Sequence, residues 1–185
     1  NVLLLLPPST EGTGSIASEA LTALESLPVS AELDCLRPST EANFIEHLSN
    51  QRAHYHLVHL DGFTIDSRGI HMEDGSGGVQ TVAAAALAQT LNGAQTPIVL
   101  INASASSALN DVMSFTAGLA QNGVPQVAVA PLPIAGAGKV LLSEFFFKEL
   151  SSGSPVTTAI ATVRQAMMEH PQRPSAAGPL VSWDW

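Results

Sequence analysis

Cysteine and positive charge are scarce in this 185-residue chain. The one cysteine, Cys35, excludes an internal disulfide and a cysteine-rich metal site, and it fits a reducing, cytoplasmic location. Only 7 residues are Lys or Arg against 16 Asp or Glu, and the net charge is −9. Because nucleic-acid surfaces need clustered basic side chains to neutralise phosphates, we expect no nucleic-acid partner.

Long hydrophobic runs are also missing. No apolar run approaches the ~20 residues that cross a membrane, and Val2–Leu6 is too short for a signal peptide, so we expect no membrane partner. Charged residues make up only 12% of the chain and hydrophobic residues 45%, which predicts an ordered domain with a sizeable core. The chain begins at Asn1 without a Met, and we interpret residues 1–185 as a single domain from a longer multidomain protein.

Apolar runs typical of buried strands alternate with segments of helical spacing along the chain. The expected strands are 2–6, 29–36, 54–60, 69–72, 98–101 and 126–130. The expected helices are 15–27, 40–48, 81–91, 110–121, 140–150 and 155–169, and the Pro-rich tail from residue 171 has no predicted element. This alternation predicts an α/β fold with a mostly parallel sheet and helices on both of its faces.

The polar residues that follow two of these strands are the first candidates for a site. Functional groups in open α/β sheets gather beyond the carboxyl ends of the strands, and Ser104 lies where a nucleophile would stand. A serine hydroxyl needs an adjacent base, and His59, just before Asp61, is the best candidate. The competing interpretation makes Ser104 and Ser106 turn-capping residues and His59 a core histidine.

Three other motifs are weaker. Gly12–Ala17 matches G-x-G-x-x-A and could belong to a nucleotide-binding module with Asp34, but five residues separate it from the preceding strand. Gly136–Lys139 resembles a P-loop without its Ser or Thr, and His54 with His56 forms an H-x-H pair without a third ligand. We therefore expect no cofactor and no metal.

Seven short segments occur in an order that resembles one known family. They are Leu36–Thr40 (L-R-P-x-T), Tyr55–Gly62 (Y-H-V-V-H-F-D-G), Glu73–Gly75 (F-E-D), Leu100–Ala103 (V-L-N-A), Gly123–Ala128 (G-V-P-A-V-V), Phe145–Gly153 (F-Y-x-x-L-x-x-G) and Asp184–Trp185 (D-W). Together they resemble the CHAT family, which are caspase-like peptidase domains. The resemblance covers nearly the whole chain and implies a caspase-like three-layer sandwich whose mostly parallel sheet has about six strands.

The chain departs from this family at both catalytic positions. The family histidine follows Asp-Gly, where this chain has Phe63, and the family cysteine follows Asn-Ala, where it has Ser104. The resemblance then implies a pseudopeptidase, a regulatory or interaction module that binds a protein or peptide partner, including other domains of the parent chain. Two alternatives stay open, namely an active hydrolase or peptidase that uses Ser104 with His59, and a nucleotide-binding module at Gly12–Ala17.

Overall fold

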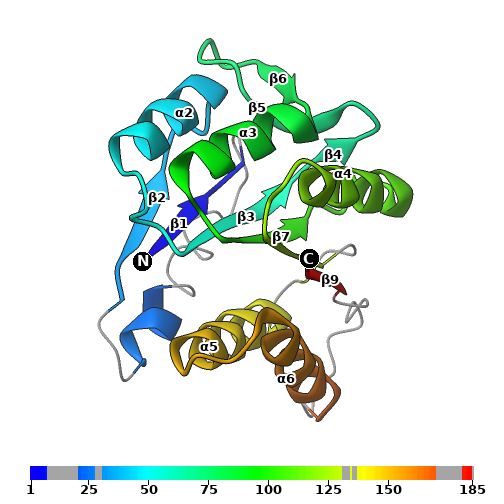
Figure 1. Ribbon diagram of the computed structural model, residues 1–185. Helices are drawn as coiled ribbons and strands as arrows, with labels where there is room; N and C mark the ends of the chain where they lie inside the picture. Colours follow the sequence, from blue (N-terminus) through cyan, green and yellow to red (C-terminus); the bar gives the residue numbers. More distant parts are fainter. Residues whose placement is uncertain (8–20, 28–30, 131–133, 135–136, 170–180, 185) are drawn as a thin grey trace.

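A central sheet lies between two layers of helices in the computed structural model of the chain (Figure 1). The structure describes residues 1–7, 21–27, 31–130, 134, 137–169 and 181–184. The sheet has six strands in the order β2 (Leu33–Leu36), β1 (Val2–Leu5), β3 (Leu57–Phe63), β7 (Ile98–Ala103), β8 (Gln126–Ala130) and β9 (Val181–Asp184). The first five strands run parallel, and β9 pairs antiparallel with β8. The predicted α/β fold with a mostly parallel sheet is confirmed.

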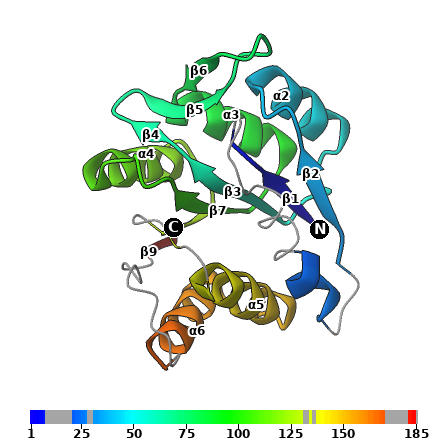
Figure 2. The ribbon, with the colours of Figure 1, turned by 180° about the vertical axis from the view of Figure 1, so that it is seen from behind.

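The strands are apolar on both faces because helices cover both faces. Successive residues of β1 divide between two cores, with Leu3 and Leu5 in one and Val2 and Leu4 in the other. The first core lies under α2 (Glu41–Asn50), α3 (Ala84–Ala94) and α4 (Leu109–Gln121). The second lies under α5 (Ala137–Ser151) and α6 (Val156–Glu169), on the opposite face of the sheet (Figure 2).

A small antiparallel sheet lies beyond the carboxyl end of β3. It consists of β4 (Ile65–Asp66), β5 (Gly69–Glu73) and β6 (Val79–Val82). Gly69 is required at the start of β5, because a Cβ there would lie 2.1 Å from the backbone oxygen of Val82. The sheet buries one side against the first core, so its other side is free to carry polar residues.

Local signals place the helix boundaries close to where the sequence predicts them. The hydroxyl of Thr40 accepts a hydrogen bond from Asn43 N at 3.0 Å and caps α2, as expected from its position. Gly123, with φ of +90°, follows α4 and ends it. No helix in the described ranges is both long enough and apolar enough to cross a membrane.

Several strands differ from the sequence prediction. β2 is limited to Leu33–Leu36 instead of 29–36, and β4 was not predicted. The third strand runs over 57–63 instead of 54–60, because β7 continues to pair with it past Asp61. Residues 79–82 form β6, although part of this segment was predicted as the start of a helix. Residues 181–184 form β9 within the tail that had no predicted element. β6 and β9 are short and depend on pairing with other strands, which local periodicity does not report.

Candidate functional site

The carboxyl ends of β3 and β7 lie side by side and bring together Phe63 and Ser104, the positions to which the resemblance assigns the catalytic histidine and cysteine. Asp61 pairs with Asn102 and Phe63 with Ala103, with a register irregularity at Gly62, whose φ is +80°. Ser104 N donates a hydrogen bond to the Phe63 oxygen at 2.9 Å. Phe63 and Ser104 are therefore neighbours at the strand ends.

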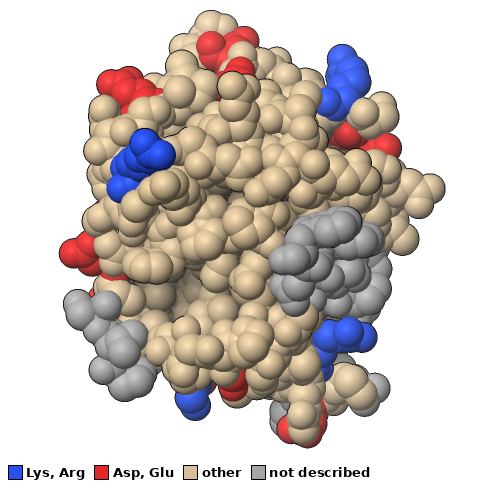
Figure 3. Space-filling model, in the orientation of Figure 1, with Lys and Arg blue, Asp and Glu red and all other residues tan. Residues whose placement is uncertain are grey.

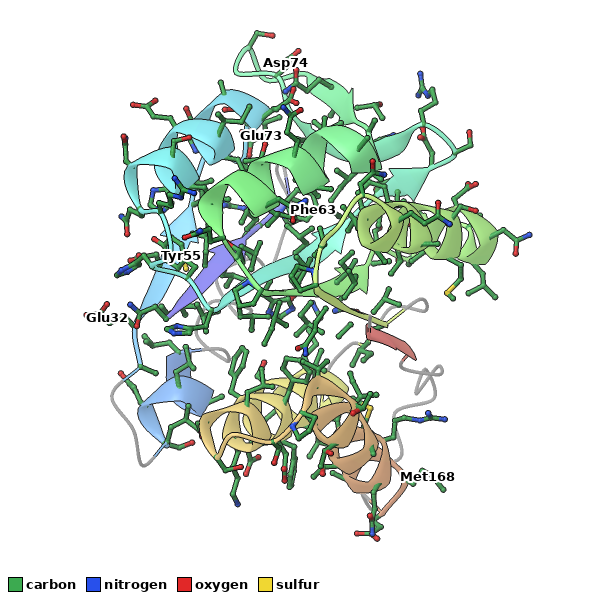
Figure 4. All side chains as sticks on the ribbon, viewed as in Figure 1. Glu32, Tyr55, Phe63, Glu73, Asp74 and Met168 are labelled. Carbon is green, nitrogen blue, oxygen red and sulfur yellow. The ribbon has the colours of Figure 1, made fainter. Side chains whose placement is uncertain are left out.

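Phe63 is an apolar core residue. Its side chain has 0% exposure and belongs to the core between the sheet and helices α2 to α4 (Figure 4). A phenyl ring has no nitrogen that could accept or donate a proton. The position that the resemblance assigns to a catalytic histidine is thus filled by a buried ring without acid–base chemistry.

Ser104 belongs to a chain of hydroxyl groups. Its Oγ lies 2.8 Å from Ser106 Oγ, which lies 2.8 Å from Thr64 Oγ1. A third serine, Ser107, accepts a hydrogen bond from Ile65 N at 2.8 Å. Hydroxyls bonded to one another satisfy their hydrogen-bonding groups, but none of them is basic enough to deprotonate its neighbour. Ser104 has no imidazole as a hydrogen-bond partner within the described part of the chain.

His59 lies on the other face of the sheet, within the second core. It is 3% exposed, and its ring meets Phe147 of α5 edge-on with the centroids 6.4 Å apart. Both ring nitrogens lack a hydrogen-bond partner among the described residues. The hydrogen bond between Ser104 and His59 that a serine hydrolase would need is not formed.

Asp61 and Asn102 hold the strand ends together. The buried Asp61 carboxylate accepts a hydrogen bond from Asn102 Nδ2 at 2.7 Å. It also forms an ion pair with Lys139 Nζ of α5 at 3.3 Å. Asn102 in turn accepts a hydrogen bond from Ile134 N at 3.0 Å and donates one to Ile134 O at 3.3 Å. The polar residues at these strand ends thus tie β3, β7 and α5 together.

Comparison with known protein families agrees with this arrangement. The model of the CHAT domain matches residues 7–183. The chain belongs to the CHAT family. The family is caspase-like and related to peptidases, which agrees with the layered fold and with the order of its motifs. The comparison with curated proteins found no match.

One polar pair of this CHAT domain was missed by sequence reasoning. His71 Nε2 lies 2.9 Å from Asp66 Oδ2, and His71 N donates to Thr64 O at 2.9 Å, so His71 stands directly across from Thr64. Hydrogen bonds from His71 and then from Arg68 hold the pKa of Asp66 well below its usual range. The alternation of the apolar residues Ile70 and Met72 around His71 indicates that the His71 side chain lies on the other side of the strand. Identifying Asp66 as its partner required the register of the hairpin.

The other sequence candidates are the Gly12–Ala17 motif with Asp34 and the His54–His56 pair. Gly12–Ala17 lies outside the described residues. The Asp34 carboxylate accepts a hydrogen bond from the hydroxyl of Tyr55. Burial, followed by this hydrogen bond, raises the pKa of Tyr55. His54 lies 3.8 Å from Glu32, and the described ranges contain no group of three His, Cys, Asp or Glu that could hold a metal.

Replacing His59 by Leu should stabilise this CHAT domain and flatten its response to acid. Burial lowers the pKa of His59 in the folded state, so at acidic pH the unfolded chain binds a proton that the folded chain does not. Stability should fall as pH decreases below about 6.5, by up to ~1.4 kcal/mol per unit for one group. The variant should gain ~1–2 kcal/mol at pH 8, because it removes two buried nitrogens that have no hydrogen-bond partner among the described residues. Urea unfolding at pH 8 and pH 5.5 measures both effects. If the stability of the variant changes with pH as much as that of the parent, or does not rise at pH 8, the corresponding expectation is wrong.

Proposed function

We propose that this CHAT domain is a pseudopeptidase that binds a protein or peptide partner without cleaving it. The observation that carries the proposal is the pair of neighbouring strand-end residues Phe63 and Ser104. The Phe63 ring is buried, and among the described residues the Ser104 hydroxyl is hydrogen-bonded only to the Ser106 hydroxyl and to a backbone N–H. A thiol peptidase works through a thiolate generated next to an imidazole. Neither group stands at the two positions that the family motifs assign to them.

A protein partner fits the charge and composition of the chain. The net charge of −9 disfavours a nucleic-acid surface, and regulation by binding needs no reactive group at the strand ends. Other domains of a parent chain belong to the same class of partner. A cytoplasmic location is part of the proposal, and the single free Cys35 fits it.

A fluorophosphonate probe and a peptide library test the proposal together. The probe should not label the chain, and peptides that the chain retains should be recovered intact by mass spectrometry. The variant Ser104→Ala should behave like the parent in both assays. Labelling or cleavage that disappears in Ser104→Ala would overturn the proposal.

A second candidate function, hydrolysis by the hydroxyl chain, is favoured by one observation. The His71–Asp66 pair stands across from Thr64, which is hydrogen-bonded to Ser106. An imidazole held by a carboxylate is the usual activator of a hydroxyl nucleophile, and hydrogen bonds to the nucleophile often tighten only when substrate binds. This hydrolase would lose fluorophosphonate labelling in His71→Ala and in Ser106→Ala but keep it in His59→Leu. A hydrolase that used Ser104 with His59 would instead keep the labelling in His71→Ala and lose it in His59→Leu.

A further inference from the structure

A groove runs between α2 and α3 on the outer side of the domain, where the two helices lie next to each other in both views (Figures 1 and 2). The groove has a volume of about 520 Å³. The two helices run in the same direction, because Ala53 N, just after α2, donates to Ala94 O at the end of α3 at 2.8 Å. The lining residues are Glu41, Ile45, Ser49, Arg52, Ala86, Gln89, Thr90, Gly93 and Ala94.

The groove combines an exposed apolar side chain on α2 with open space near the end of α3. Ile45 of α2 is 43% exposed. On α3, a Cβ built on Gly93 would meet nothing within 4 Å, and the helix contains no charged residue. Figure 3 shows few charged side chains on the face of the domain to which these helices belong. A bulky apolar residue next to a shallow, small-residue surface is the shape of a helix–helix contact.

The two ends of the groove carry opposite charges. Glu41 lies at the start of α2 and Arg52 just past its end, about 16 Å apart at 1.5 Å per residue. Neither residue has an ion-pair partner among the described residues. Ile45 lies between them, four residues after Glu41 and seven before Arg52. A second α2 that runs antiparallel across the groove would set its Arg52 against Glu41 and its Glu41 against Arg52.

We propose that the α2–α3 groove is the interface of a symmetric homodimer, so that the occupant of the groove is α2 of a second copy of this chain. A two-fold axis makes an interface self-complementary only when each patch carries both members of every contact. The groove meets this condition, with Glu41 and Arg52 at its ends and with Ile45 facing the small residues of α3. Antiparallel helix dipoles also favour this orientation over the parallel one.

The dimer is independent of the proposed function. The groove is formed by α2 and α3, whereas Phe63, Ser104 and the hydroxyl chain lie at the ends of β3 and β7. Dimerisation can therefore be tested without any assay of activity or of peptide binding, and its failure would leave the pseudopeptidase proposal unchanged.

Sedimentation equilibrium over a wide micromolar range tests the dimer, since a reversible dimer gains mass with concentration. Glu41→Arg and Arg52→Glu each place like charges at both ends of the interface, so each should weaken the dimer at least tenfold. The double variant Glu41→Arg/Arg52→Glu should restore it. An equimolar mixture of the two single variants should form a heterodimer, because opposite charges then meet at both ends.

Gly93→Phe tests the groove itself. The added ring should fill the open space and abolish the dimer without disturbing the fold. The matched control is Ser114→Phe, which adds the same ring at an exposed site on α4, outside the groove, and should leave the dimer intact. A parent chain that stays monomeric at the highest concentration would overturn the proposal. Failure of the double charge exchange to restore the association, or equal effects of the two Phe variants, would overturn it as well.

Discussion

Replacing Phe63 by His and Ser104 by Cys together should give a thiol that reacts with iodoacetamide about ten times faster near pH 6.5 than the thiol of Ser104→Cys alone. The single variant places a cysteine among hydroxyls, where a thiol with a pKa of about 8.5 is only about 1% thiolate at this pH. An imidazole on the neighbouring strand end would lower that pKa to about 6.5 and raise the thiolate fraction about 50-fold. A thiolate with a lower pKa is also a weaker nucleophile, and this reduces the gain in rate several-fold.

The structural basis of this expectation is the hydrogen bond from Ser104 N to Phe63 O, which makes the two positions neighbours. The alkylation rate should be measured as a function of pH, since the midpoint of the profile reports the thiol pKa without knowledge of any substrate. Phe63→Leu/Ser104→Cys is the matched control, because it changes the same two positions without adding an imidazole. If this control and the His variant show the same midpoint, the strand ends do not have the geometry of a thiol peptidase.

Replacing Lys139 by Met should lower the free energy of unfolding by about 3 kcal/mol, because it leaves a buried charge without its counter-ion. The side chain of Asp61 is only 3% exposed, and Lys139, 21% exposed, is the one cation paired with it among the described residues. After the change, the Asp61 carboxylate keeps the hydrogen bond from Asn102 but no neutralising charge. Urea denaturation at neutral pH measures the loss.

Two further variants identify the cause of that loss. Lys139→Met/Asp61→Asn removes both charges and should recover most of the stability, since an amide at position 61 needs no counter-ion. Lys148→Met shortens an exposed lysine on the same helix and should change stability by less than about 0.5 kcal/mol. Equal effects of the Lys139 and Lys148 variants would mean that the ion pair contributes nothing to stability.

The layered fold could be predicted because its strands carry continuous apolar runs such as Val2–Leu6, which only a sheet covered on both faces can bury. For the same reason, the sequence did not indicate toward which face of the sheet the His59 side chain points, because polar residues mark neither face of such a strand. The neighbouring positions of Phe63 and Ser104 followed from strand order. The pairing of His71 with Asp66 did not, since it depends on a hairpin register that the sequence leaves open.

The position of β9 has a consequence for the order of folding during synthesis. β9 covers the outer edge of β8, although Val181 lies about 50 residues after the end of β8 along the chain. A ribosome releases β8 well before β9, so a nascent chain carries an open edge of unpaired backbone N–H and C=O groups for several seconds at ordinary elongation rates. Helices α5 and α6 emerge in this interval and can pack on the face of the sheet, but they leave its edge open. Chaperone dependence and premature self-association should therefore be greatest for chains arrested between residues 170 and 180.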